Sequence, residues 1–450
     1  MPRPLNEETL ALCRTAFAAD PLARFARNAV TKTAIKAVAL NRDAVAQLTH
    51  TYSHTVKAGK TTSQNASGRC WMFAGLNLFR MQAAAALGVE DFEISQNYLM
   101  FWDKLEKANY FLENILATLD EPVGSRLLDW LCASPLQDGG QWDMFVNLVK
   151  KYGVVPKEAM PETESSSRSA DMNALMTLKL REYASELRAA HAGGVSEEAL
   201  RAQKEAQLPT LYRMLVTHLG EPPQQFLWQW RDKEKYFHRD GLLTPQQFRE
   251  KYVTEDLDEL VCLIHCPQAT KAYNTLYTIA YLGNVVAGQP IRYLNVEMHV
   301  LKSATQAMIQ AGKSVWFGCD VGKMMDRDLG LMDLELFEYG PLYGTTFTMD
   351  KAARLDYGQS LMTHAMVLTG VDLDESGMSC KWRVENSWGD KGGDQGFMAM
   401  TDPWFEEYLY EVVVEKKYLP QELLALLEGP LVPLDPWDPM GSLATSGVTI

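Results

Sequence analysis

The sequence predicts an α+β fold, with a helix-rich first part and a strand-rich last part. Helical patterns occupy much of residues 61–161, and residues 171–219 are rich in Ala, Leu, Glu, Arg and Gln, which favour amphipathic helices. From about Val285 onward strand patterns dominate, for example at residues 314–318. A chain of 450 residues exceeds what one hydrophobic core usually supports, so we expect two or three subdomains.

The first 60 residues predict a helical arm. Asn6 is a suitable N-cap, and Ala11, Phe17 and Phe25 are among the apolar positions of the predicted helices. The start of the chain lacks the apolar core of a secretory signal, and no uninterrupted apolar stretch is long enough to span a membrane. The seven cysteines are scattered and odd in number, which does not suggest a disulfide framework. We therefore expect a cytoplasmic protein.

A cysteine stands at the start of a predicted helix. The run from Trp71 to Leu87 is apolar, and Gly88 suits a left-handed C-terminal cap. Backbone N–H groups at a helix start attract negative charge, so Cys70 would be stabilised there as a thiolate that can attack a carbonyl carbon. Taken alone, Cys70 is more readily interpreted as a structural residue, because cysteine is among the most buried residue types. Whether Cys70 is structural or catalytic depends on the residues that lie near it in the fold.

A predicted hairpin near the other end of the chain offers such partners. Residues 360–370 and 380–389 have the pattern of two strands joined by a turn. If the hairpin is centred near Glu375, His364 and Asn386 face each other, and the asparagine oxygen could hold an imidazole N–H. A one-residue slip would place them on opposite faces. A lone histidine in an apolar strand is more often a core residue, but a facing amide favours catalysis.

The chain resembles the papain-like cysteine peptidases, and among them bleomycin hydrolase and the bacterial aminopeptidase C. The positions that carry this resemblance are Gln64, 67–71, the strand of His364, 386–389, 317–323, 404–417 and 437–444. The resemblance implies a papain-like fold, in which a helical left part carries Cys70 and a β-rich right part carries His364. It also implies a peptidase that needs no cofactor and no metal.

The resemblance assigns a catalytic role to each of these residues. Cys70 would attack the peptide carbonyl to form an acyl-enzyme, and His364 would hold the matching positive charge and then protonate the leaving amine. Asn386 would orient the ring, and Gln64 would donate its amide N–H to the oxyanion together with the N–H of Cys70. A thiolate–imidazolium pair predicts a bell-shaped pH profile and rapid, selective alkylation of Cys70.

Three further positions are expected to border the substrate. Trp388 would lie over the asparagine and exclude water, and Gly68 and Ala444 would lie beside the bound peptide. Without the resemblance, Gln64 is equally an ordinary polar loop residue, and Trp388 is equally an aromatic core residue.

The distance along the chain between Cys70 and His364 is far longer than the roughly 130 to 150 residues of simple papain-like enzymes. The resembled subfamily fills this interval with a helical domain that helps to build a ring of six subunits, which implies a homohexamer. The predicted parts are an N-terminal arm (1–60), a left part (61–161), a helical insertion (162–284), a right part (285–418) and a C-terminal tail (419–450).

The C-terminal tail determines the kind of peptidase. In the resembled subfamily the last residues enter the cleft of their own subunit, and the terminal carboxylate meets the free amino group of the substrate, which makes an aminopeptidase. Related tails commonly stop near Leu443 and Ala444, whereas residues 445–450 continue here. The extension could be trimmed by the enzyme, could loop away from the cleft, or could be foreign to the natural protein.

The composition argues against a nucleic-acid-binding protein, and the spacing of two cysteines argues against a metal site. A formal charge of −14 disfavours a nucleic-acid surface. Cys262 and Cys266 lack a second close pair of ligands, so their segment is interpreted as a core strand and not as a metal site.

Three functions stay open at this point. The favoured one is a cytoplasmic thiol aminopeptidase that acts on short peptides, with amide-bearing small molecules such as bleomycin as a further class of substrate. An endopeptidase or oligopeptide-releasing enzyme would result if the tail sits elsewhere. A ring-forming binding protein is the third, and the presence of Cys70, His364 and Asn386 counts against it.

Overall fold

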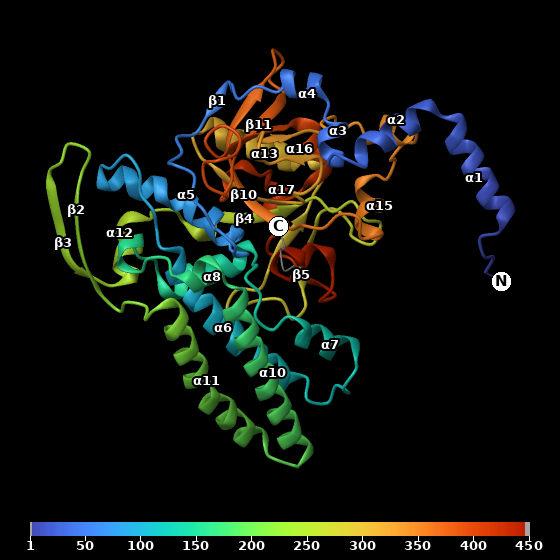
Figure 1. The fold of residues 1–450 in the computed structure, drawn as a ribbon. Helices are drawn as coiled ribbons and strands as arrows, with labels where there is room; N and C mark the ends of the chain where they lie inside the picture. The colour runs from blue at the N-terminus through green and yellow to red at the C-terminus, as the bar shows by residue number, and fades with distance from the viewer. Residues whose placement is uncertain (1, 446–450) are drawn as a thin grey trace.

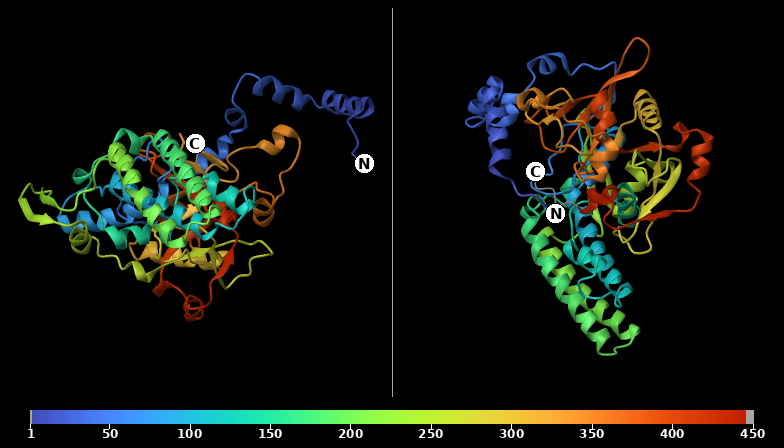
Figure 2. Two further views of the ribbon diagram at one scale, coloured as in Figure 1. Left: turned by 90° about the horizontal axis from the view of Figure 1, so that it is seen from below. Right: turned by 90° about the vertical axis from the view of Figure 1, so that its right-hand side faces the viewer.

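The computed structural model describes residues 2–445, which form a helical body and a sheet-rich body packed together (Figure 1). The α+β prediction is confirmed. A helical arm projects from the sheet-rich body in all views (Figures 1 and 2). Its elements are α1 (Glu7–Ala19), α2 (Pro21–Val30), α3 (Ile35–Ala39) and α4 (Arg42–Gln47). Asn6 caps α1 as predicted, because its side chain accepts the N–H of Thr9 at 2.9 Å.

The helical body is built around α5, which begins at Cys70 and is buried on nearly every side. It ends at Gly88 with φ of 67°, which confirms the predicted left-handed cap. The pair α10 and α11 extends away from the body (Figures 1 and 2) and confirms the amphipathic helices predicted at 171–219. The helices are α5 (Cys70–Leu87), α6 (Gln96–Ala117), α7 (Arg126–Ala133), α8 (Trp142–Tyr152), α9 (Glu164–Ser167), α10 (Ala170–Ala192), α11 (Glu197–Leu219) and α12 (Pro245–Tyr252).

The sheet-rich body contains a mixed sheet whose strands follow the order β14-β5-β6-β4-β13-β7-β10-β11-β12-β9-β8, with β1 paired to β10. These strands are β1 (His54–Thr55), β4 (Leu260–Ile264), β5 (Thr275–Ile279), β6 (Tyr293–Asn295), β7 (Val315–Cys319), β8 (Met325–Asp326), β9 (Leu331–Met332), β10 (His364–Leu373), β11 (Ser379–Glu385), β12 (Phe397–Thr401), β13 (Leu409–Glu415) and β14 (Val432–Leu434). The strand expected around Cys262 is confirmed as β4. A separate hairpin joins β2 (Phe226–Arg231) and β3 (Phe237–Leu243).

The sheet has a hydrophobic core on each face. One core contains α13 and α16, and the other contains α5 and so joins the two bodies. The remaining helices are α13 (Met298–Gln310), α14 (Tyr339–Tyr343), α15 (Lys351–Asp356), α16 (Asp402–Tyr408), α17 (Gln421–Leu426) and α18 (Ser442–Thr445). Residues 162–284 hold α9–α12 and also β2–β5, and the division into predicted parts stays a prediction. None of the helices between residues 2 and 445 combines the length and the apolar character needed to cross a bilayer.

The predicted hairpin is confirmed as β10 and β11, but its predicted register is wrong by two residues. Val367 pairs with Glu385, whereas a centre at residue 375 would pair it with Arg383. The turn is centred one residue later, because the Asp374 carboxylate accepts the N–H groups of Ser376 and Met378. The shift is even at Val367 and Leu368, on the side of the bulge nearer the site, so His364 and Asn386 remain neighbours there.

Candidate active site

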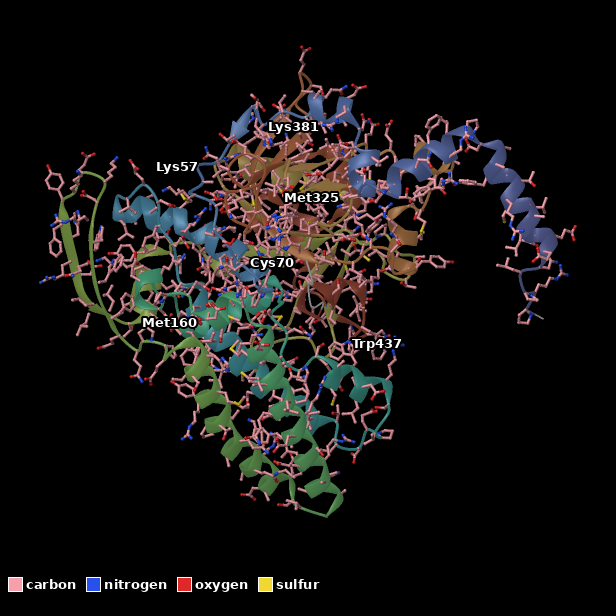
Figure 3. All side chains as sticks on the ribbon, in the orientation of Figure 1. Lys57, Cys70, Met160, Met325, Lys381 and Trp437 are labelled. Atoms are coloured by element: carbon pink, nitrogen blue, oxygen red, sulfur yellow. The ribbon has the colours of Figure 1, made fainter. Side chains whose placement is uncertain are left out.

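The nucleophile candidate lies where the two bodies meet (Figure 3). Cys70 opens α5, and its sulfur accepts the N–H of Ala365 at 3.4 Å. Ala365 follows His364, the first residue of β10. The packing of α5 against β10 therefore brings a sulfur from the front of the chain to the histidine strand, as the sequence predicts. Both Cys70 and His364 are almost fully buried.

The imidazole of His364 is held by an amide. Its Nε2 lies 2.9 Å from Oδ1 of Asn386, and this oxygen also accepts the N–H of Ser387 at 2.7 Å. Because a carbonyl oxygen can only accept, Nε2 carries a proton, and the lone pair of the neutral ring is then on Nδ1. Among residues 2–445, Nδ1 has no hydrogen-bond partner. The ring is thus oriented with a free base nitrogen.

The indole of Trp388 packs on the histidine. The ring centroids of Trp388 and His364 are 4.9 Å apart, and the guanidinium of Arg327 lies 4.7 Å from the indole centroid on Trp388. The sequence places Trp388 over Asn386, whereas the ring contact in the structure is with His364. The indole therefore covers the imidazole itself and limits its access to water.

Gln64 is bound into the same site by backbone pairing. Its N–H donates to the carbonyl of Ser387 at 2.8 Å, and its side-chain oxygen accepts the Ser387 hydroxyl at 2.6 Å. Its Nε2 donates one hydrogen to the carbonyl of Ser67 at 2.5 Å, three residues before Cys70. The amide nitrogen carries a second hydrogen, which leaves Gln64 one donor for an oxyanion.

Asp138 organises the start of the cysteine helix, and no local motif points to it. Its carboxylate accepts the N–H of Gly68 at 2.9 Å and the amide of Asn173 at 2.7 Å, and it forms a 2.6 Å ion pair with Lys104. Its backbone carbonyl accepts the indole N–H of Trp71 at 2.7 Å. Burial opposes ionisation of Asp138, but Lys104 and the hydrogen bonds hold its pKa well below the usual range. Gly68, expected beside the substrate, is therefore fastened to Asp138.

A buried ion pair fixes the residue before the nucleophile. The guanidinium of Arg69 binds the carboxylate of Glu162 with two bonds of 3.1 and 2.7 Å, and its Nε donates to the Ser67 hydroxyl at 2.9 Å. Two parallel bonds to a carboxylate fix direction as well as distance. These bonds therefore hold Ser67 and Arg69, the residues that lead into α5, in place.

Burial shifts the pKa values of both Cys70 and His364. Burial raises the pKa of the Cys70 thiol to about 11, although the N–H groups of Ala365, Trp71 and Cys70 oppose this shift. Burial also lowers the pKa of His364 to about 4, against the favourable bond to Asn386. Burial therefore favours a thiol and a neutral imidazole in the closed site, and the thiolate–imidazolium pair stays a prediction.

These pKa values predict the pH dependence of the reaction. Below about pH 4 the ring of His364 is protonated and cannot accept the thiol proton, and above about pH 11 the pair has lost the proton that the leaving amine needs. We expect kcat/KM to be flat across neutral pH, with limbs near those values, when measured from pH 3 to pH 11. An acid limb near pH 7 would show that the histidine is more solvated in the working enzyme.

The C-terminal tail lies across the junction between the two bodies. The carbonyl of Met440 accepts from Gln141 Nε2 at 3.3 Å and from the hydroxyl of Tyr293 at 3.4 Å. The hydroxyl of Ser442 donates to the carbonyl of Met362 at 2.7 Å, two residues before His364. These bonds connect the tail to both bodies.

The end of the described tail is tightly packed. A side chain at Gly139 would overlap the carbonyl oxygen of Leu443, so the close approach requires glycine there. Ala444 is buried and lines a cavity of about 280 Å³. Other residues around this cavity are Lys107, Tyr110, Asn114, Trp130 and Tyr281. The backbone of Thr445 completes α18, and the remainder of the extension, residues 446–450, lies outside the described residues.

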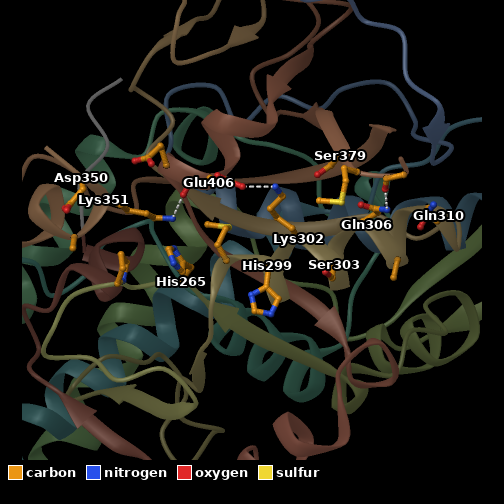
Figure 4. Close-up of a pocket in the computed structure, with 17 residues that line it drawn as sticks. His265, His299, Lys302, Ser303, Gln306, Gln310, Asp350, Lys351, Ser379 and Glu406 are labelled. Atoms are coloured by element: carbon orange, nitrogen blue, oxygen red, sulfur yellow. Dashed lines mark hydrogen bonds and ion pairs between the residues drawn. The ribbon is translucent and has the colours of Figure 1, made fainter. Parts of the chain in front are cut away.

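A larger cavity, of about 910 Å³, lies elsewhere, beside α13 and α15 (Figure 4). No predicted site residue and no cysteine lines it. Lys351 donates there to the carbonyls of Glu406 at 2.8 Å and Leu409 at 2.6 Å, and burial lowers its pKa to about 7. Within residues 2–445 no group of three His, Cys, Asp or Glu side chains could hold a metal ion. The candidate active site therefore remains the junction where Cys70 meets the strand of His364.

Known cysteine peptidases match nearly the whole chain. The model of the Peptidase C1-like family matches residues 4–441. Aminopeptidase C of Listeria innocua serovar 6a is 49% identical over 416 residues, which cover 92% of this chain and 93% of that protein. Bleomycin hydrolase of Homo sapiens is 41% identical over 449 residues, which cover 98% of this chain and 99% of that protein.

The fold is also that of a solved structure. The crystal structure of PepW from Lactobacillus rhamnosis HN001 superposes with a TM-score of 0.96 at 47% identity, covering 98% of this chain and 99% of that one. The papain-like fold and the resemblance to bleomycin hydrolase and aminopeptidase C are thus confirmed. The chain belongs to the Peptidase C1-like family and is a cysteine-type aminopeptidase.

Proposed function

We propose that this enzyme releases N-terminal residues from peptides through a Cys70–His364–Asn386 triad, with its own tail limiting access to the cleft. The observation that carries the proposal is the 2.9 Å bond from His364 to Asn386, on a strand whose next N–H contacts the Cys70 sulfur. A nucleophile, a base and a group that orients the base are the elements of nucleophilic catalysis of acyl transfer.

The first half-reaction follows from the protonation states. The Cys70 thiol gives its proton to Nδ1 of His364 as the sulfur attacks the substrate carbonyl, and the new positive ring is stabilised by the oxygen of Asn386. The N–H of Cys70 and the second amide hydrogen of Gln64 bind the oxyanion. His364 then returns the proton to the leaving amine, and an acyl-thioester remains on Cys70.

The second half-reaction regenerates the enzyme. A water molecule gives a proton to Nδ1 of His364 and attacks the thioester, and the ring then protonates the departing Cys70 sulfur. The acid product leaves as the amino acid that stood at the N-terminus. Gln64 binds the oxyanion again in this step, so its loss should slow both halves of the reaction.

The tail accounts for the preference for free N-termini. Its residues from Met440 to Ala444 are buried between the walls of the site, so a substrate extended at its N-terminus meets an occupied channel. We propose that the chain beyond Ala444 is trimmed or displaced, so that a carboxylate near this position binds the substrate ammonium.

Amino-acid amides and their N-acetylated counterparts test this proposal. We expect cleavage of the free-amine forms, at least about 10²-fold faster than the acetylated forms, because acetylation adds bulk and removes the ammonium. Iodoacetamide-sensitive release of the amine would be measured for both series. Equal rates would indicate an endopeptidase, and no thiol-dependent cleavage would indicate a binding protein.

Loss of the orienting amide should weaken catalysis without ending it. We expect Asn386→Ala to lower kcat about 10²-fold, because the ring of His364 loses its fixed direction but keeps its proton chemistry. Asn386→Asp is the matched control, since it retains an acceptor oxygen at the same place. Steady-state kinetics would contradict the assignment if the alanine variant kept full activity.

We further propose that the enzyme works in the cytoplasm as a homohexamer. The arm supports an assembly, because Leu12, Leu22 and Phe25 on it are 67%, 71% and 67% exposed in the isolated chain. A sedimentation mass near that of the single 50.6 kDa chain would contradict the hexamer.

A further inference from the structure

The peptide unit that joins Ser67 to Gly68, here called the 67–68 peptide, is held at both ends by side chains. Its carbonyl oxygen accepts one amide hydrogen of Gln64 at 2.5 Å, and its N–H donates to the carboxylate of Asp138 at 2.9 Å. A trans peptide unit is planar and its C=O and N–H point in opposite directions, so fixing the N–H also fixes the direction of the C=O. Asp138 and Gln64 are therefore connected through one rigid unit.

The direction of this carbonyl matters because it takes one of the two hydrogens of the Gln64 amide. The side-chain oxygen of Gln64 is held in turn by the hydroxyl of Ser387 at 2.6 Å. Together the two bonds fix the plane of the amide, and so fix the place of the second hydrogen, which is the one left for an oxyanion. A donor stabilises an oxyanion most when it is already in position before charge develops.

Glycine at position 68 makes room for the contact with Asp138. A side-chain carbon at Gly68 would lie 2.9 Å from Cβ of Asp138, which is closer than such atoms approach each other in proteins. A larger residue would therefore push the carboxylate away from the N–H of the 67–68 peptide.

Asp138 is itself anchored on the helical body. Its oxygen Oδ1 accepts from Lys104 of α6 at 2.6 Å and from Asn173 of α10 at 2.7 Å. Its other oxygen, Oδ2, accepts the N–H of Gly68 and the hydroxyl of Ser169. Two donors on each oxygen give the carboxylate a single orientation, and charge assistance from the ammonium strengthens the set. The helical body thus determines the position of the 67–68 peptide.

A direct effect of charge on the nucleophile does not explain this acid. Burial is the main reason that the pKa of Cys70 is raised, and the negative charge of Asp138 acts in the same direction. A carboxylate that favours the thiol does not help to generate the thiolate. Any contribution of Asp138 to catalysis is therefore one of geometry.

We propose that Asp138 is a positioning residue for the oxyanion hole, which fixes the 67–68 peptide and thereby directs the free amide hydrogen of Gln64 to the oxyanion. The inference rests on the proposed peptidase function and on the role of Gln64 in it. Asp138 does not touch the substrate in this role. It acts through Gln64 alone, so its effect should vanish when that amide is absent.

A double-mutant cycle between Asp138 and Gln64 tests the inference. Asp138→Asn keeps the shape of the side chain, but it removes the charge that holds Lys104 and weakens the bond to Gly68. We expect kcat for amino-acid amides to fall about 10-fold and KM to stay within about two-fold, because a loosely held oxyanion donor affects the transition state and not the bound substrate. Gln64→Ala should lower kcat about 10²-fold.

The two losses should not multiply. We expect kcat of the double variant to be about 10²-fold below the parent, as for Gln64→Ala alone, and not about 10³-fold below it. Alkylation of Cys70 by iodoacetamide forms no oxyanion, so it should be no slower in Asp138→Asn than in the parent enzyme. The matched control is Glu106→Gln, which neutralises another buried acid of α6 and should leave kcat within about two-fold.

A second variant covers the case in which Asp138→Asn does not fold. Ser169→Ala removes a donor to the oxygen that also binds Gly68, and it should cause a smaller loss of kcat that disappears in the Gln64→Ala background. Losses that multiply, an unchanged kcat in the Asp138 variant, or slower alkylation of Cys70 would overturn the inference alone. An unchanged kcat in Gln64→Ala would overturn the oxyanion role of Gln64 as well, and a parent enzyme without Cys70-dependent cleavage would overturn the proposed function.

Discussion

Replacement of Cys70 by serine is expected to lower kcat/KM for amino-acid amides by about 10⁴-fold or more, with the fold intact. The thiol already needs His364 to take its proton, since burial raises its pKa to about 11. A hydroxyl at the same place is a far weaker acid, so transfer to Nδ1 of His364 would be rare and the attacking oxygen would stay neutral. Initial rates with an amino-acid amide, at equal protein concentration, give the ratio.

Two exposed cysteines serve as matched controls for this loss. Cys13→Ser and Cys380→Ser remove the same sulfur from surface positions and should change kcat/KM by less than about two-fold. Thermal unfolding of all three variants would show whether folding is preserved. A Cys70→Ser enzyme with more than a hundredth of the parent activity would contradict its assignment as the nucleophile.

Local signals in the sequence identified the elements of the fold. The N-cap at Asn6 and the left-handed Gly88 depend on a few neighbouring residues, and both are found as predicted. The facing of His364 and Asn386 followed from the alternation of side chains along a strand. Its register was wrong because the Asp374 turn, and not the midpoint of the apolar pattern, sets the pairing.

Features that depend on distant contacts could not be read from the sequence. Asp138 binds Gly68, a residue far from it along the chain. The charge state of Cys70 also depends on contacts with residues distant along the chain. The helix start predicts a thiolate, but burial of the sulfur is the larger effect, and burial is a property of the folded chain.

Removal of residues 439–450 is expected to make N-acetylated peptides good substrates. Burial of Met440 and Leu443 should stabilise the docked tail by about 3 kcal/mol after the cost of ordering it, so the open fraction would be near about 1%. Because only the open form admits a blocked N-terminus, deletion should raise kcat/KM for acetylated peptides by about 10²-fold. Free-amine substrates should lose their advantage.

The same change should expose the sulfur. With the tail absent, water reaches Cys70, and the burial that raises its pKa is reduced, so alkylation by iodoacetamide at pH 7 should become faster than in the parent enzyme. Mass spectrometry would follow Cys70 against Cys13, an exposed thiol in the same chain, as the internal reference.

A point substitution distinguishes the effect of displacing the tail from the effect of removing its residues. Leu443→Asp should reproduce both effects in the full-length protein, whereas Leu443→Met, which keeps an apolar side chain of similar volume, should leave the cleft closed. If the deletion and Leu443→Asp both still reject acetylated peptides, exclusion must come from the fixed walls of the cleft. In that case the buried position of Met440 to Ala444 would be structural, and the preference for a free amino group would have to be sought among the residues around Gly139.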